Sequence, residues 1–174
     1  MDYFKMSQDR RVRGAAQPID MDALHRLSKE ELDAVPSLNY YISGSVGVSY
    51  PDYIDYPVKL VSEKLKKIMV KYQKDALMKT VVLIEKEKQR QKIYYYILPP
   101  QLDCAAENNN MAADDDRLVL DQEKIGSSRI FQVVGKRQDL IVRLDVAESI
   151  LRRNPNGVWF EKVLTAQKVR DGGI

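Results

Sequence analysis

The residue types that most often carry out chemistry are scarce in this chain of 174 residues. It has one histidine, His25, and one cysteine, Cys104. A zinc site needs three or four ligands, and a nucleophilic Ser or Cys needs a base beside it. No such spacing surrounds His25 or Cys104, and no glycine-rich phosphate-binding pattern occurs. We therefore predict no metal, no cofactor and no catalytic residues; an enzyme of unrecognised type would have to use His25 or Cys104.

Acidic residues gather in one segment, residues 101–116, which is rich in Asn and Asp and lacks periodicity. We expect a long exposed loop or an irregular hairpin tip there. Three consecutive aspartates could bind a hard cation, but the EF-hand spacing is absent, so a solvated acidic loop is the simpler interpretation. Long loops in compact domains often carry function. The partner-binding residues predicted on this basis are Asp103, Glu107, Asp114, Asp115 and Asp116.

Charge is unevenly distributed along the chain. Residues 59–92 hold 11 Lys or Arg against four Asp or Glu, and residues 103–123 hold seven acidic residues against Arg117. Such poles can steer association with a complementary partner, or they can simply be the solvated faces of a helix and a hairpin. The basic 59–92 region suggests an alternative function, a small nucleic-acid-associated regulator. The net charge of +3 is mild, and no nucleic-acid-binding signature accompanies it.

The overall composition is that of a globular domain, with 44% apolar and 30% charged residues. A single cysteine forms no internal disulfide and suits a reducing compartment. The chain begins without an apolar signal region, and no apolar run is long enough to span a bilayer. We therefore predict a cytoplasmic protein that does not bind membranes. No pattern in the sequence indicates its oligomeric state.

Residues 140–163 give the clearest local structure: an apolar strand, a short helix, a turn and a second strand. Asp145 followed by Glu148 predicts a capping box at the start of the helix. The apolar residues after Asp145 fall on one helical face, and Asn, Pro and Gly at residues 154–157 predict the turn. The expected core consists of Val142, Ile150, Leu151 and either Trp159 or Phe160.

Elsewhere the patterns predict a strand at residues 3–7, short helical turns within residues 22–35 with a capping box of Ser28 and Glu31, and a tyrosine-rich segment at residues 39–57. A helix capped by Ser62 follows, and then comes a hairpin at residues 80–98, whose first strand is apolar on both faces at residues 81–84 and is therefore expected to be central. Strands near residues 117–120 and 129–134 follow, with a turn at residues 126–128 between them. Strands and helices do not alternate regularly, which favours an α+β fold with a mainly antiparallel sheet and a few short helices. We expect a single compact domain over residues 1–174, with an irregular N-terminal part (1–57) and a helix-plus-sheet core (58–164).

Two segments resemble a known family. DYFKMSQDRR at residues 2–11 and RIFQVVGKRQDLIVRLDVAESILRRNPNGVWFEKV at residues 129–163 are similar to immunity-protein family eleven, a bacterial family formerly described as a domain of unknown function. The middle of the chain matches less specifically. The resemblance implies a non-enzymatic protein that binds and neutralises a cognate toxin of a polymorphic toxin system. It supplies no toxin-binding residue. If the acidic loop is not the inhibitory surface, the tyrosines of residues 40–56 are the next candidates.

Overall fold

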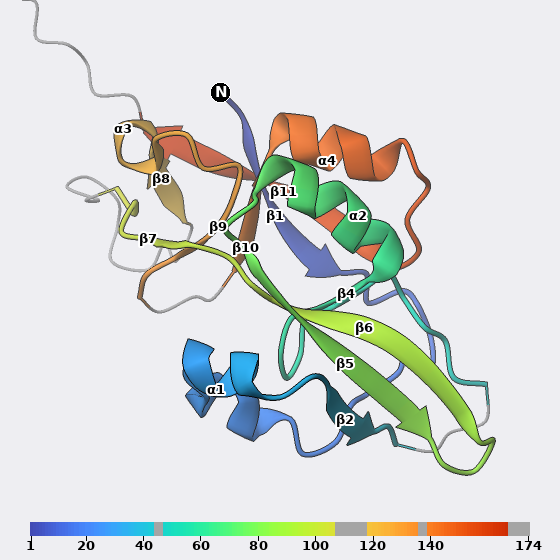
Figure 1. Cartoon of the computed structure of the whole chain (residues 1–174). Coiled ribbons are helices and arrows are strands. Elements are labelled where there is room, and N and C mark those ends of the chain that lie inside the picture. The colour runs from blue at the N-terminus through green and yellow to red at the C-terminus, as the bar shows by residue number, and fades with distance from the viewer. Residues whose placement is uncertain (44–46, 107–117, 136–138, 167–174) are drawn as a thin grey trace, which may run out of the picture.

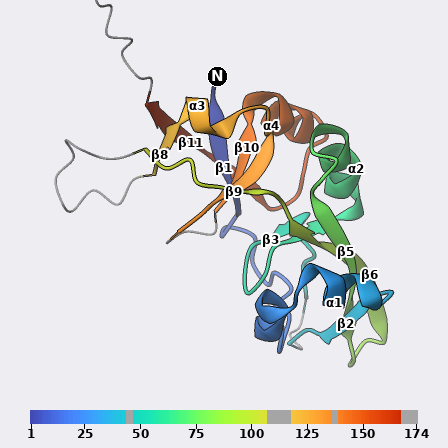
Figure 2. The same ribbon diagram turned by 60° about the vertical axis from the view of Figure 1, so that its left-hand side comes forward.

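The fold is α+β and is built from two sheets and a few short helices. A computed structural model describes residues 1–43, 47–106, 118–135 and 139–166. Both sheets are mixed, but most of their strand pairs are antiparallel. Figures 1 and 2 show the sheets at opposite ends of the molecule, joined through the packing of two helices. The predicted α+β class and single compact domain are confirmed.

The first sheet gathers strands from both ends of the chain. Its spatial order is β7 (Gln101–Leu102), β9 (Ile130–Val133), β10 (Leu140–Arg143), β1 (Tyr3–Gln8), β11 (Val158–Ala166) and β8 (Val119–Asp121). β1 lies between β10 and β11 and pairs antiparallel with both. The parallel pairs are β7 with β9 and β8 with β11, so they lie at the two edges. The N-terminal part of the chain therefore supplies a central strand of this sheet.

The second sheet is built around the predicted hairpin. Its spatial order is β2 (Leu38–Tyr41), β5 (Leu77–Glu85), β6 (Arg90–Leu98), β4 (Leu60–Ser62) and β3 (Tyr53–Ile54). β5 and β6 pair antiparallel along their whole length, and β5 is an internal strand, as its apolar sequence predicts. β3 is an edge strand in the tyrosine-rich segment, consistent with the prolines on either side of it.

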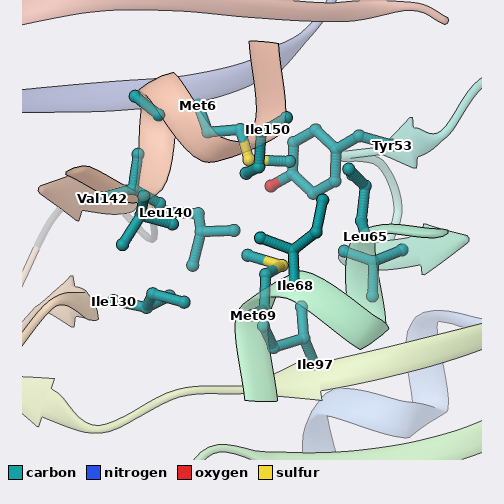
Figure 3. Packing of buried hydrophobic residues seen from close by; sticks show 13 residues of the cluster. Met6, Tyr53, Leu65, Ile68, Met69, Ile97, Ile130, Leu140, Val142 and Ile150 are labelled. Atoms are coloured by element: carbon teal, nitrogen blue, oxygen red, sulfur yellow. The ribbon is translucent and has the colours of Figure 1, made fainter. Parts of the chain in front are cut away.

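Two helices join the sheets. α2 (Glu63–Tyr72) begins at the predicted cap, where Ser62 Oγ accepts a hydrogen bond from the backbone N–H of Leu65. It packs on β4 and β6, whereas α4 (Leu144–Leu151) packs on β10 and β1, and the two helices contact each other. Figure 3 shows the cluster that they bury between the sheets. Its members include Met6, Tyr53, Leu65, Ile68, Met69, Ile97, Ile130, Leu140, Val142 and Ile150.

The outer face of each sheet is covered separately. On the first sheet, Tyr3, Phe131, Ile141 and Leu120 pack with Ile125 of α3 (Gln122–Ile125). The second sheet is covered by the 3-10 helix η1 (Asp22–Arg26) and by α1 (Lys29–Ala34). The capping box predicted at the start of α1, between Ser28 and Glu31, is present. The sequence did not predict α3, because only a turn was expected between β8 and β9.

The predicted capping box at α4 is wrong. The N-cap of α4 is Arg143, because β10 runs directly into the helix. Asp145 lies inside the first turn, where it accepts two hydrogen bonds from the Arg143 guanidinium at 2.9 and 2.6 Å. Glu148 accepts a hydrogen bond from Arg152 one turn later at 3.3 Å. Asp145 Oδ1 also accepts a hydrogen bond from the backbone N–H of Val146 at 3.0 Å, but the reciprocal pair of hydrogen bonds that defines a capping box does not form.

The predicted core is right in part. Val142 and Ile150 belong to the central cluster, and Phe160 packs against it. Leu151 is 54% exposed, because it is the last residue of a short helix and lies one step round the helix from buried Ile150. Trp159 is 49% exposed, because it points to the face of β11 opposite Phe160. A Leu151→Ala change should therefore have a small effect on stability.

Candidate binding pocket

An open pocket of about 650 Å³ lies where one end of the first sheet meets the second sheet. Its wall comes from β1 and the loop that follows, from β3 and the segment leading to β4, and from the starts of β10 and β11. This volume falls within the range of about 300–1,000 Å³ that is usual for ligand pockets. The lining residues are 5–11, Tyr53, Asp55, Tyr56, Lys59, Asp139, Leu140, Trp159 and Glu161.

The pocket floor consists of Tyr53, Lys59 and Asp139. Tyr53 is 0% exposed, and its hydroxyl oxygen points into the apolar cluster, beside Met6 and Ile150 (Figure 3). Oδ1 of Asp139 forms an ion pair with Lys5 Nζ at 3.1 Å. Within the described residues, the buried Tyr53 hydroxyl and the buried Oδ2 of Asp139 have no hydrogen-bond partner. The floor therefore holds both a donor and an acceptor that the protein leaves unsatisfied.

Lys59 adds a positive charge to this floor. Burial lowers the pKa of its ammonium, and the carboxylates of Asp139 and Asp55 only partly offset that effect. Among the described residues no carboxylate lies within ion-pair distance of the Lys59 ammonium. Asp55 is already occupied, since it accepts hydrogen bonds from Gln8 N at 2.9 Å and from Arg10 at 2.7 Å.

The pocket rim consists of exposed residues with different chemistry: Arg10, Arg11, Tyr56, Trp159 and Glu161. The Arg11 guanidinium lies 4.7 Å from the centre of the Trp159 ring, so the two side chains stack. Asp9 fixes the other side of Arg11 through ion-paired hydrogen bonds of 2.7–3.2 Å. Exposed Trp, Tyr and Arg side chains are the types that most often dominate binding energy at protein interfaces.

Gly157 sets the position of this rim. Its φ of +70° lies in the left-handed region, and a Cβ at this position would come within 2.5 Å of Pro51 Cβ. Its carbonyl oxygen accepts a hydrogen bond from Asp9 N at 3.0 Å, which ties the loop carrying Arg10 and Arg11 to the start of β11. A side chain at residue 157 would be strained by this φ and would clash with Pro51.

A second buried charge lies close to the pocket in the sequence but is arranged differently. Asp52 Oδ1 accepts a hydrogen bond from Ser62 Oγ at 2.6 Å, and Oδ2 accepts bonds from Lys64 Nζ at 2.9 Å and from Asn156 N at 2.8 Å. Burial opposes the ionisation of Asp52, but these hydrogen bonds outweigh it and lower its pKa. The Asp52 network joins β3, α2 and the turn before β11, so its role is structural.

The predicted partner-binding residues do not line the pocket where the structure describes them. Asp103 is exposed beyond the end of β7, at an edge of the first sheet. Glu107, Asp114, Asp115 and Asp116 lie outside the described residues. The tyrosine-rich segment, which is the second candidate, contributes Tyr53 to the floor and Tyr56 to the rim.

Cys104 does not lie in an exposed polar loop as its sequence context suggests. It is 0% exposed, with its side chain among Tyr3, Leu120 and Phe131. Burial, with a further contribution from Asp103, raises the pKa of the thiol to about 11, so the thiolate is disfavoured at neutral pH. His25 belongs to η1. No group of three His, Cys, Asp or Glu side chains that could hold a metal ion occurs among the described residues.

The basic side chains of residues 59–92 lie in several different surroundings. Lys64, Lys67, Lys88 and Arg90 form ion pairs, while Lys59 lies in the pocket. Lys66 stacks on the Tyr95 ring at 3.7 Å. Only Lys64 pairs with an acid from outside the region, Asp52, so these ion pairs leave most of its net charge of +7 in place. No helix in the described part of the chain is both long enough and apolar enough to cross a membrane.

Most of the pocket comes from the two segments that carry the family resemblance, residues 2–11 and 129–163. They meet because β1 pairs with β10 and β11. Sequence reasoning missed the pocket because its charged residues are far apart in the chain. The local signals were charged residues within the strands, among them Lys5 in β1 and Glu161 in β11. No family model matches the chain, and no curated protein matches it.

Proposed function

We propose that this chain is a non-enzymatic immunity protein that binds a cognate bacterial toxin in the cytoplasm of the producing cell. The observation that carries the proposal is the convergence of the two segments resembling immunity-protein family eleven, residues 2–11 and 129–163, on one open pocket. The two segments meet through strand pairing, and the residues that they leave exposed there form a surface that a partner can reach.

The chemistry of the rim suits recognition of a protein. Trp159 is 49% exposed and Tyr56 is 72% exposed, and Arg11 stacks on Trp159. Rigid aromatic side chains bury much apolar area at a low cost in conformational entropy, and Arg offers several donors in a fixed geometry. A toxin surface seated on this rim would have its own active or substrate-binding face covered. Inhibition then needs tight binding and no chemical step.

The acidic residues Asp103, Glu107, Asp114, Asp115 and Asp116 remain a proposed second contact. An acidic segment can accelerate association with a basic toxin surface, because long-range attraction acts before the interface forms. The two proposed contacts make different contributions. Loss of the acidic charges should mainly slow association, whereas loss of a rim aromatic residue should mainly speed dissociation.

The experiment is a binding titration against the protein whose gene adjoins this one and whose C-terminal domain is the toxin. Trp159→Ala should weaken binding by about 30-fold, equivalent to about 2 kcal/mol. Tyr41→Ala is the matched control, because Tyr41 is 55% exposed on β2 at the far edge of the second sheet. Replacing the five acids by amides should lower the association rate at low salt.

Three results would contradict parts of this proposal. Failure of the wild-type protein to bind or inhibit the toxin would reject the immunity function. Wild-type affinity in Trp159→Ala would remove the pocket rim from the interface. Strongly salt-dependent binding of nonspecific nucleic acid, with no toxin binding, would favour the alternative regulator that uses the basic 59–92 region.

A further inference from the structure

We propose that an extended segment of the protein partner pairs as an added strand with the open edge of β11, residues 158–163, and places a lysine or arginine opposite Glu161. Backbone hydrogen bonds would hold the segment, and the rim side chains Trp159 and Glu161 would select it. The inference rests on the proposed function for the identity of the partner, but the strand pairing can be tested without the toxin.

The first argument is that β11 has an unpaired edge at the surface. On one side, β1 pairs with residues 158–163. On the other side, β8 pairs with Leu164–Ala166 only, so residues 158–163 have no neighbouring strand there in the part of the chain that the structure describes. Figure 2 shows β8 beside the end of β11. Trp159, Glu161 and Lys162 are exposed, so a partner can reach this edge.

The hydrogen bonds to β1 show which backbone groups face the open edge. Asp9 N donates to Gly157 O at 3.0 Å, just before β11 begins. Successive residues of an antiparallel strand direct their backbone groups to opposite sides. Odd-numbered residues of β11 therefore bond to β1, and the N–H and C=O groups of Val158, Phe160 and Lys162 point to the open edge. Among the described residues, these groups have no hydrogen-bond partner.

The edge also lacks the features by which proteins usually prevent strand addition, such as prolines, bulges and lysines that project over the edge. Residues 158–163 contain no proline, and their register with β1 is uninterrupted, so no bulge bends this part of the strand. The Lys162 ammonium is held by Asp2 at 2.9 Å. A row of unpaired backbone groups is a template for another strand.

Glu161 indicates which strand fits. Its side chain is exposed, on the same face as Trp159, and lies opposite Lys5 of β1. Lys5 Nζ already binds Asp139 at 3.1 Å, and no described residue forms an ion pair with Glu161. An added strand would place one of its residues opposite Glu161 on the other side, about 4.5–5.5 Å away between Cβ atoms. A basic residue there pairs with Glu161, and an apolar residue two positions along the strand contacts Trp159.

A second copy of this chain would fit the edge less well. In a two-fold antiparallel pairing, the residues opposite one face of β11 come from the same face of the other copy. That face carries Trp159, Glu161 and Val163 and no cation. Glu161 would then meet an apolar side chain or another carboxylate. A different protein with a basic residue in an extended segment therefore suits the edge best.

The test uses two acetylated, amidated pentapeptides with valine at both ends, threonine at the second and fourth positions, and lysine or glutamate in the centre. Each sequence reads the same in both directions, so it suits a parallel or an antiparallel strand. In an NMR titration of the full chain, the lysine peptide should shift the amide signals of Val158, Phe160 and Lys162 and slow their hydrogen exchange. The glutamate peptide should bind about fivefold more weakly at low salt.

A substitution at Lys162 separates the backbone from the side chain. Lys162→Pro removes an N–H that points to the open edge and leaves the hydrogen bonds to β1 in place. Lys162→Ala is the matched control, because it loses the same ion pair with Asp2 but keeps the N–H. Lys162→Pro should weaken the lysine peptide and the toxin about tenfold, and Lys162→Ala less than about twofold. Dispersed amide spectra establish that each variant is folded.

A charge reversal at Glu161 tests the choice of strand. Glu161→Lys should reverse the preference, so that the glutamate peptide binds about fivefold more tightly than the lysine peptide. Glu63→Lys is the matched control, since it makes the same change in charge at an exposed residue of α2. This variant should keep the preference for the lysine peptide.

Several results would overturn the inference. One is that neither peptide alters the amides of Val158, Phe160 and Lys162, and another is that both peptides bind equally well. Protection of these amides that grows with protein concentration, without any ligand, would show that a second copy occupies the edge. Equal weakening by Lys162→Pro and Lys162→Ala would mean that the backbone N–H does not take part.

Failure of the proposed function has a different signature. In that case the lysine peptide binds the edge as expected, but the wild-type chain does not bind the toxin. Conversely, a toxin that inhibits normally and binds Lys162→Pro as tightly as Lys162→Ala would leave the immunity function intact and reject strand addition at β11.

Discussion

The Asp52 network and the pocket floor are two buried charged sites in adjoining parts of the chain, and they differ in how completely their polar groups are satisfied. Asp52 accepts hydrogen bonds from Ser62, Lys64 and Asn156 at 2.6–2.9 Å. On the floor, the Tyr53 hydroxyl and Asp139 Oδ2 have no partner among the described residues. Both sites join elements of the two sheets, so position alone does not distinguish them. A buried group whose hydrogen bonds are all formed stabilises the fold, whereas a buried group that lacks a partner costs free energy.

The pKa directions express the same contrast. At Asp52, hydrogen bonds to the ionised carboxylate outweigh burial and lower the pKa, so ionisation of Asp52 favours the folded state. At Lys59, burial is the largest influence and lowers the pKa, so ionisation of Lys59 disfavours the folded state. A stabilising charge and a destabilising charge therefore lie within one compact region. Groups that lower the free energy of unfolding in this way are common at the sites where proteins bind ligands.

The largest effect on stability is expected from Asp52→Asn. This change leaves the Lys64 ammonium, Ser62 hydroxyl and Asn156 N–H without an ionised acceptor, and it should lower the free energy of unfolding by about 2–3 kcal/mol. For a domain of this size the melting temperature should fall by about 5–10 °C. Thermal denaturation followed by circular dichroism measures the shift. Glu63→Gln, which breaks an exposed pair with Lys67, is the control and should melt like wild type. An unshifted melting curve for Asp52→Asn would show that the network is not structural.

The second prediction is the pH dependence of that difference. Because the pKa of Asp52 is lower in the folded state, its contribution is complete above the unfolded pKa of about 3.9 and is lost as the pH falls through the folded pKa. The stability gap between wild type and Asp52→Asn should thus be largest near neutral pH and shrink below about pH 4. Urea denaturation at a series of pH values measures it. A gap that stays constant down to about pH 2 would contradict the expected sign of this dependence.

Lys59→Met should have the opposite effect on stability. Replacing a partly buried, unpaired ammonium by an apolar side chain of similar length should raise the free energy of unfolding by about 1 kcal/mol at pH 7. The advantage should disappear as the pH rises through the unfolded lysine pKa of about 10.4, where the wild-type penalty is relieved. Urea denaturation at pH 7 and pH 10 tests both statements. A destabilised Lys59→Met variant would mean that the Lys59 ammonium already has a partner in the folded state. Lys59 and Asp52 would then both stabilise the fold.

The smallest effect is expected from Tyr53→Phe. Its hydroxyl has no partner among the described residues, so its removal should change the free energy of unfolding by less than about 0.5 kcal/mol. Tyr94→Phe is the matched control, since the equally buried Tyr94 hydroxyl donates a hydrogen bond to Pro51 O at 2.6 Å. Its loss should cost about 1 kcal/mol. Equal costs at the two positions would mean that the Tyr53 hydroxyl is satisfied in solution.

The sequence by itself determined the features whose causes are local. Ser62 caps α2, and Ser28 with Glu31 caps α1, because each cap needs only a hydroxyl or carboxylate within three residues of the N–H that it binds. The turn at residues 154–157 follows from its Asn, Pro and Gly. The β5–β6 hairpin follows from two apolar strands joined by a short polar segment. In each case the interacting groups are neighbours in the chain.

Only the tertiary structure decided which residues the core and the pocket would use. The insertion of β1 between β10 and β11 depends on pairing across most of the chain, and no periodicity encodes it. Direct continuation of β10 into α4 made Arg143 the cap in place of Asp145, and the short helix left Leu151 half-exposed. Lys59 is one of 11 basic residues in its region, and its sequence neighbours do not set it apart. Its surroundings are formed by Asp139, Tyr53 and Asp55. Whether a buried charge has a partner therefore depends on where the fold places residues that are distant in the sequence.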